Sequence, residues 1–109
     1  MNKKIAIIGA GGHGKVVGEI ALLNQYEIIH FFDERIDEIK NFPFTINGNL
    51  AQLKNDFKNY DEFFVAIGDN KTRHKKISWL REEKANIAVL IHPKSTISKF
   101  STLGVGTCV

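Results

Sequence analysis

Residues 3–14 read Lys-Lys-Ile-Ala-Ile-Ile-Gly-Ala-Gly-Gly-His-Gly, and this stretch decides the fold. The apolar, mostly β-branched run predicts a buried strand, and the glycines predict the turn that follows it. Gly9, Gly11 and Gly14 have the G-x-G-x-x-G spacing, which suits a tight turn and close approach of the backbone to a phosphate. Apolar residues at helical spacing over residues 15–23 predict a helix beginning near Gly12. Because a helix N-terminus attracts anions, we expect a phosphorylated small molecule as ligand; the alternative is a glycine-rich turn that binds nothing.

The composition predicts one small folded domain. The chain has 109 residues, of which 43% are hydrophobic and 25% charged, and only two are prolines, which argues against disorder. The net charge of +3 is too small to indicate nucleic acid, and no basic run is interleaved with aromatic residues, so no nucleic-acid partner is expected. The single cysteine, Cys108, can form no internal disulfide and has no metal-binding set around it. A cytoplasmic location follows as an expectation, with no metal and no membrane span, since the apolar run before Gly9 is far too short for a signal peptide or a span.

A second strand is predicted over residues 27–32 and ends at Asp33. Together with the first strand and helix it makes a βαβ unit of about thirty residues, the length expected for a parallel neighbour. Asp33 then lies at the same sheet edge as the glycine turn, 19 residues after Gly14. In dinucleotide-binding folds an acidic residue near this position binds a ribose hydroxyl, whereas the alternative is a solvated acid in a turn.

The middle of the chain predicts weaker elements. Pro43 excludes a central strand over residues 35–47, although residues 45–48 could form a short edge strand. Asn49 is a candidate N-cap for a short helix that carries Leu50 and Leu53. The continuous apolar run over residues 63–67 predicts a strand buried on both faces.

The next informative stretch is Gly68-Asp69-Asn70. Asp69 or Asn70 suits an N-cap, and the pattern predicts a helix to about Ala85. Cations crowd its first turns, where they oppose the helix dipole unless an anion binds there. We expect Arg73 to bind such an anion and the neighbouring lysines to form a solvated basic face. A further strand is predicted over residues 86–90.

Aliphatic residues then recur every six positions, at Ile91, Ile97, Leu103 and Val109. Neither a helix nor a flat strand has this period, whereas a β-solenoid with three faces per coil does. We therefore expect residues 1–90 to form an α/β domain, a small Rossmann-like parallel sheet flanked by helices. Residues 91–109 are expected to begin such a solenoid, which would continue beyond them; the alternative is a coincidental spacing in a tail.

The glycine turn, Asp33, the segment from Ala66 to Arg73 and the His92-Pro93 lead into the six-residue repeat together resemble the PglD/NeuD family of bacterial sugar acyltransferases. The resemblance implies a Rossmann-type domain that binds a UDP-amino sugar, or a sialic-acid-type sugar, for cell-surface glycan biosynthesis. It also implies that residues 91–109 begin a left-handed hexapeptide-repeat β-helix, which forms a homotrimer and holds acetyl-CoA for transfer to the sugar. The implied catalytic base is a histidine beyond Val109, so this chain alone is expected to bind its substrate weakly and to be inactive.

The resemblance also implies a set of substrate-binding residues, in which Asp69 departs from the asparagine common among relatives. They are Gly11, Gly12, His13 and Gly14 in the phosphate and sugar loop, Asp33 near the uridine, and Gly68, Asp69, Asn70 and Arg73 in a second nucleotide-contacting turn. His30 is expected to be a strand residue and His92 a linker residue.

Two other functions stay open at this stage. The glycines and Asp33 also satisfy the fingerprint of an NAD-binding oxidoreductase, although the chain has no second mononucleotide-binding half. A non-catalytic nucleotide sensor is the other alternative.

Overall fold

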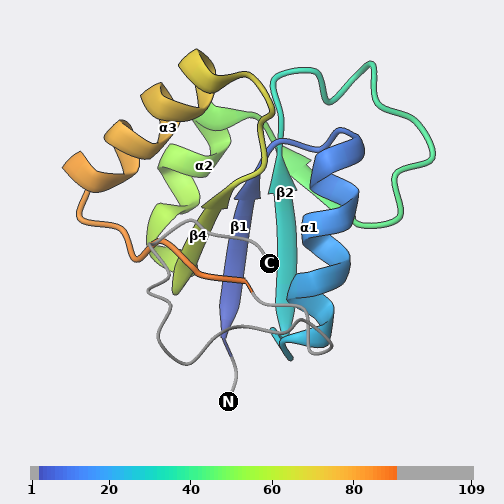
Figure 1. The fold of residues 1–109 in the computed structure, drawn as a ribbon, viewed down its shortest axis with the longest axis horizontal. Helices are drawn as coiled ribbons and strands as arrows, with labels where there is room; N and C mark the ends of the chain where they lie inside the picture. Colours follow the sequence, from blue (N-terminus) through green and yellow to red (C-terminus); the bar gives the residue numbers. More distant parts are fainter. Residues whose placement is uncertain (1–2, 91–109) are drawn as a thin grey trace, which may run out of the picture.

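The computed structural model describes residues 3–90 and shows a four-stranded parallel sheet with helices on both faces (Figure 1). The strands lie in the order β3-β2-β1-β4. In sequence order the elements are β1 (Lys4–Ile8), α1 (Gly12–Leu23), β2 (Ile28–Phe32), β3 (Thr45–Gly48), α2 (Leu50–Asp56), the 3-10 turn η1 (Phe57–Asn59), β4 (Glu62–Val65) and α3 (Asn70–Glu82). The predicted βαβ unit is confirmed, because β1 pairs in parallel with β2 from Lys4 opposite Ile28 to Ile8 opposite Phe32.

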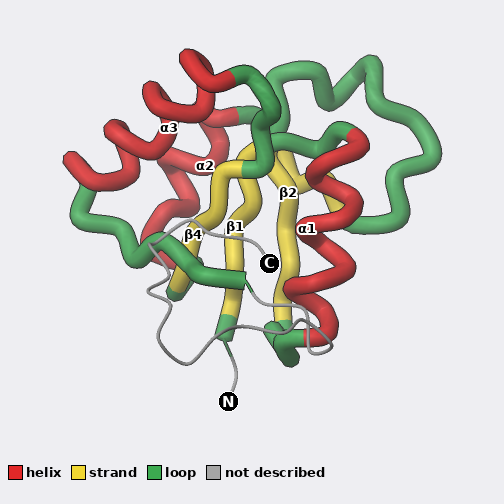
Figure 2. Tube along the Cα trace, in the orientation of Figure 1, coloured by secondary structure: helices red, strands yellow, loops and turns green. Residues whose placement is uncertain are grey.

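Two apolar cores lie on opposite faces of the sheet, because successive strand residues point to opposite sides. Ile5 and Ile7 of β1 pack against α1, which covers one face. Ala6 and Ile8 pack in the other core with Leu53 of α2 and Leu80 of α3. Figure 2 shows α1 on one side of the strands and α2 with α3 on the other. The glycine turn therefore emerges between two helical layers.

Three predictions about the middle of the chain are confirmed. Residues 45–48 form the edge strand β3, which pairs with β2. Asn49 caps α2 through a capping box in which its side chain accepts from the Gln52 N–H and the Gln52 side chain accepts from the Asn49 N–H. Asp69 is the N-cap of α3, and its carboxylate accepts from the Thr72 N–H at 2.9 Å.

The predicted strand over residues 86–90 is wrong. With β4 this segment makes one parallel bridge, between Ile87 and Phe63, with hydrogen bonds from the Phe63 N–H to the Asn86 carbonyl and from the Ala88 N–H to the Phe63 carbonyl. Since both bonds use the same β4 residue, no ladder develops. Ala88 and Leu90 are nevertheless buried in the core beside α1.

The helix predicted to run to about Ala85 ends earlier, at Glu82. Lys84 has φ +59°, and the Ala85 N–H donates to the carbonyl of Leu80, so a left-handed residue turns the chain out of the helix. Similarly, β4 ends at Val65 instead of continuing to Ile67. Ala66 and Ile67 therefore lie in the turn after β4. The hexapeptide pattern and the domain boundary predicted at residue 91 involve residues outside those described.

No helix within residues 3–90 combines the length and the apolar character that a membrane crossing requires.

Candidate functional site

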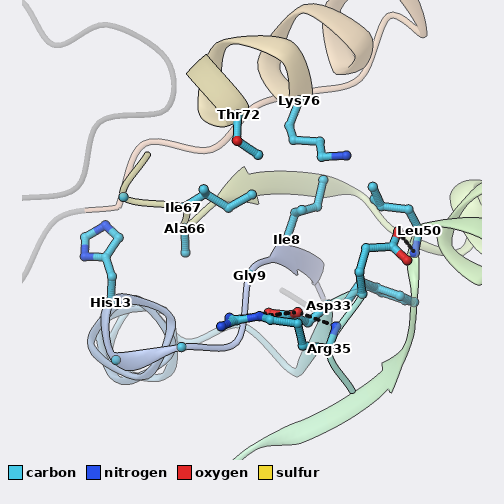
Figure 3. Close-up of a pocket in the computed structure, with 15 residues that line it drawn as sticks. Ile8, Gly9, His13, Asp33, Arg35, Leu50, Ala66, Ile67, Thr72 and Lys76 are labelled. Carbon is cyan, nitrogen blue, oxygen red and sulfur yellow. Dashed lines mark hydrogen bonds and ion pairs between the residues drawn. The ribbon is translucent and has the colours of Figure 1, made fainter. Parts of the chain in front are cut away.

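A cavity of about 500 Å³ lies at the carboxyl edge of the sheet, where the turns after β1, β2 and β4 converge. In open parallel sheets this edge is where ligands bind. Figure 3 shows Asp33 and Arg35 on one side of the cavity, Thr72 and Lys76 across from them, and His13 on a third side. The lining residues are Ile8, Gly9, Gly11, Gly12, His13, Phe32, Asp33, Glu34, Arg35, Leu50, Ala66, Ile67, Gly68, Thr72 and Lys76.

The glycines of the first turn serve two different purposes. Gly9 has φ +110°, and a Cβ there would lie 2.5 Å from the carbonyl oxygen of Ala66. A Cβ on Gly14 would lie 3.1 Å from the carbonyl carbon of Gly9 and closer still to its oxygen. By contrast, a Cβ on Gly12 would meet nothing within 4 Å. Gly9 and Gly14 are therefore required by packing, whereas the space at Gly12 is open toward the cavity.

The start of α1 has the features of an anion site. The cap residue Gly11 has no side chain to accept a hydrogen bond, and the first turn carries no acidic residue. The first N–H groups of a helix lack partners within the helix, and the dipole places positive potential there. A phosphate over Gly11, Gly12 and His13 would satisfy both.

Asp33 is the buried carboxylate of the site, with 8% of its surface exposed. One carboxylate oxygen accepts from the Ala10 N–H at 2.8 Å, and the other accepts from the Arg35 N–H at 2.8 Å. The Arg35 guanidinium adds one bond to each oxygen, both at 3.2 Å. Burial acts to raise the pKa of Asp33, but these hydrogen bonds outweigh it and hold that pKa below its usual value. Asp33 thus ties the glycine turn to the segment after β2.

On the α3 side, the half-buried Thr72 and Lys76 line the cavity, next to an exposed helix start. The Asp69 carboxylate also accepts from the Thr72 hydroxyl at 2.8 Å, and the backbone and hydroxyl of Thr72 together lower the pKa of Asp69. The Arg73 guanidinium donates to the Asn70 side chain at 3.1 Å, within the same helix turn. One helix turn beyond Thr72, Lys76 borders the cavity.

The structure brings most of the sequence-predicted site residues to one cavity. Gly11, Gly12, His13, Asp33 and Gly68 line it, whereas Gly14, Asp69, Asn70 and Arg73 do not. Of these, Gly14 packs beneath the turn and Asp69 caps α3, so both support the site from outside the lining. Direct contact of any of these residues with a ligand stays a prediction.

The sequence reasoning missed Arg35, Leu50, Ile67, Thr72 and Lys76. Thr72, Lys76 and the buried Leu80 follow one another at intervals of four residues along one face of α3, but Arg73 and Ile77 have the same spacing, so spacing alone does not select the row that borders the cavity. Arg35 carries no such signal, since only the loop conformation after β2 brings it back to Asp33.

His30 lies outside the cavity lining and is the strand residue that was expected. Its Nδ1 lies 2.7 Å from the hydroxyl of Tyr60. Burial, with a smaller effect of Lys4, lowers the pKa of His30. This contact ties β2 to the segment before β4.

Comparison with known proteins gives consistent matches. Residues 4–80 match the model of the PglD N-terminal domain. The chain is 31% identical to the UDP-N-acetylbacillosamine N-acetyltransferase of Bacillus subtilis (strain 168), over 98% of the chain and 51% of that protein.

Solved structures of similar proteins give matches of the same kind. The acetyltransferase domain of PglB from Neisseria gonorrhoeae FA1090, in complex with acetyl coenzyme A, matches with a TM-score of 0.85 and 36% identity, over 97% of the chain and 52% of that domain. PerB from Caulobacter crescentus, in complex with CoA and GDP-perosamine, matches with a TM-score of 0.81 and 30% identity, over 97% and 50%. The chain therefore spans about half the length of the proteins that it matches.

Proposed function

The chain belongs to the PglD N-terminal domain family, and from this premise we propose that it is the nucleotide-sugar-binding domain of an acetyl-CoA-dependent sugar N-acetyltransferase. The observation that carries the proposal is the cavity at the carboxyl edge, with an uncapped helix start on one side and a lysine on the other. Its relatives act on, or were solved with, nucleotide sugars linked through UDP or GDP. A diphosphate is the feature that such ligands share, and the charge pattern of the cavity suits it.

Different parts of the cavity would contact different groups of the ligand. The N–H groups at Gly11, Gly12 and His13 would hold the diphosphate, and Lys76 would add charge from the opposite side. Apolar side chains of Phe32, Leu50 and Ile67 offer surface to a base or sugar ring. The turn formed by Gly68, Asp69, Asn70 and Arg73 would keep the start of α3 in place beside the ligand.

The reaction itself would belong to another part of the protein. Acetyl transfer to an amine needs a base that takes the amine proton and an acetyl donor within reach. We assign acetyl-CoA, the base and the homotrimer contacts to a hexapeptide-repeat β-helix that residues 91–109 would begin, with the protein in the cytoplasm. On this division the present chain supplies binding energy at a distance from the reacting atoms.

Thermal unfolding of the chain in the presence of UDP, GDP or NAD tests the binding proposal. We expect UDP or GDP to raise the melting temperature as the concentration exceeds Kd, and NAD to raise it less, because NAD shares the diphosphate but carries two nucleosides on it. Stabilisation by NAD alone would favour the oxidoreductase alternative and overturn the proposal. Assay of acetyl transfer with the complete protein then distinguishes an enzyme from a nucleotide sensor, because a sensor would bind without turnover.

A further inference from the structure

The hydrogen-bonding capacity of the Asp33 carboxylate is filled from within the protein. A carboxylate offers about four lone-pair sites, and Asp33 receives four hydrogen bonds, from the Ala10 N–H, the Arg35 N–H and two guanidinium nitrogens of Arg35. A ribose hydroxyl could bind Asp33 only by displacing one of these donors. The role suggested by the dinucleotide-binding fingerprint is therefore blocked by internal contacts.

Arg35 is placed differently, because one edge of its guanidinium is bonded to Asp33 and the other edge is open to solvent. Its side chain is 60% exposed, against 7% for that of Asp33. Of the five N–H donors of a guanidinium, Nε and Nη2 each use one on Asp33, and three have no acceptor among residues 3–90. Nη2 lies 3.6 Å from the position of a Cβ on Gly11, so the open edge is beside the glycine turn. Figure 3 shows the guanidinium extending toward the start of α1.

We propose that Arg35 contacts the diphosphate of the bound nucleotide sugar, and that Asp33 is a positioning residue that fixes the guanidinium beside the glycine turn. This inference rests on the proposed function and assigns a specific side chain to it. A guanidinium presents donors in a plane that matches phosphate oxygens, and the bidentate contact with Asp33 holds that plane in place before the ligand arrives. The diphosphate would then lie between the Arg35 donors and the backbone N–H groups of Gly12 and His13.

The experiment compares a nucleoside diphosphate with its nucleoside, so that phosphate contacts are separated from contacts to base and ribose. UDP and uridine, and in parallel GDP and guanosine, are titrated into the chain by NMR, which reaches weak affinities. The variants are Arg35→Gln, Arg35→Lys and Asp33→Asn. The control is Arg81→Gln, which alters an arginine in the last turn of α3, outside the cavity lining. The spectrum of each variant also shows whether it is folded.

We expect Arg35→Gln to weaken binding of the nucleoside diphosphate about tenfold and to leave binding of the nucleoside unchanged. Arg35→Lys should recover part of the loss, because it keeps the charge without the planar donors. Asp33→Asn should weaken binding of the diphosphate by a smaller factor, again without effect on the nucleoside, since the groups that it loosens are the Arg35 guanidinium and the glycine turn held through the Ala10 N–H.

Two results would contradict the inference in distinguishable ways. Equal loss of diphosphate and nucleoside in Asp33→Asn, with Arg35→Gln unchanged, would show that Asp33 contacts the ribose. If the wild-type chain bound neither UDP nor GDP, the proposed function would fail, and the role of Arg35 with it.

Discussion

Two glycine-containing turns border the cavity, and they are held in place by different means. The turn after β1 is fixed by backbone packing, since Gly9 and Gly14 leave no room for a Cβ and Asp33 bonds to Ala10. At the turn after β4, a Cβ on Gly68 would meet nothing within 4 Å, and the cap formed by Asp69 and Thr72 organises the start of α3. The first turn presents backbone N–H groups, whereas the second presents side chains. Substitution of the packed glycines Gly9 and Gly14 should therefore damage the fold, whereas substitution of the open Gly12 or of the lining residue Lys76 should affect mainly ligand binding.

The largest effect is expected at Gly14. Gly14→Ala forces a Cβ against the carbonyl carbon and oxygen of Gly9, which are backbone atoms and cannot rotate away. The free energy of unfolding should fall by about 3 kcal/mol or more, measured by urea denaturation. The matched control is Gly12→Ala, two residues away with open space, which should change stability by less than about 0.5 kcal/mol. Equal stability of the two variants would contradict the packing argument.

Asp33→Asn should have the next largest effect. It keeps the shape of the side chain but removes the charge that Arg35 and two backbone N–H groups stabilise, so we expect a loss of about 2 kcal/mol at pH 7.

The effect of Asp33→Asn should also depend on pH. Because the pKa of Asp33 is lowered in the folded state, its contribution is complete above the unfolded-state value of about 3.9 and is lost as the pH falls through the folded-state value. The stability difference between wild type and variant, measured from pH 7 to pH 3, should therefore shrink on acidification. A difference that stayed constant would exclude the charged pair as its source.

A smaller effect is expected at Lys76, on binding alone. Lys76→Gln removes a charge at the cavity and should weaken UDP or GDP binding about fivefold, measured by calorimetry. Arg73→Gln should weaken it less, because Arg73 bonds to Asn70 and does not line the cavity. The opposite ranking would favour the sequence-based choice of Arg73 over the structural one.

The smallest effect is expected at Asp69. Asp69→Ala removes the side-chain acceptor for the Thr72 N–H and hydroxyl, at an exposed helix start. The urea midpoint should fall less than in Asp33→Asn. A larger fall would mean that the second turn is as integral to the fold as the first.

The contrast between the turns also explains what the sequence could predict. The first turn is encoded locally, because a steric requirement for glycine leaves a recognisable spacing after a strand. The N-caps Asn49 and Asp69 are likewise encoded by residue type and position. The fold class and the cavity edge followed from these patterns.

What the sequence could not reveal depends on tertiary placement. In α3, Thr72 and Lys76 are four residues apart on one face of the helix, and Arg73 and Ile77 are four residues apart on another. Only the packing of α3 on the sheet decides which face borders the cavity. The link between Asp33 and Arg35 depends on the course of an irregular loop. Residues 86–90 have the composition of a strand but find only one partner residue on β4.

The most direct test of the binding site is a titration of UDP and GDP into Gly12→Asp, with Gly12→Ala as the control. The Cβ of an aspartate at this position would meet nothing within 4 Å, and its carboxylate would interact favourably with the helix dipole, so the fold should be as stable as wild type. Its negative charge would occupy the place assigned to the diphosphate. The account predicts that Gly12→Ala binds like wild type and that Gly12→Asp loses at least about tenfold in affinity. Equal binding by the two variants would contradict the claim that the open glycine turn holds the diphosphate.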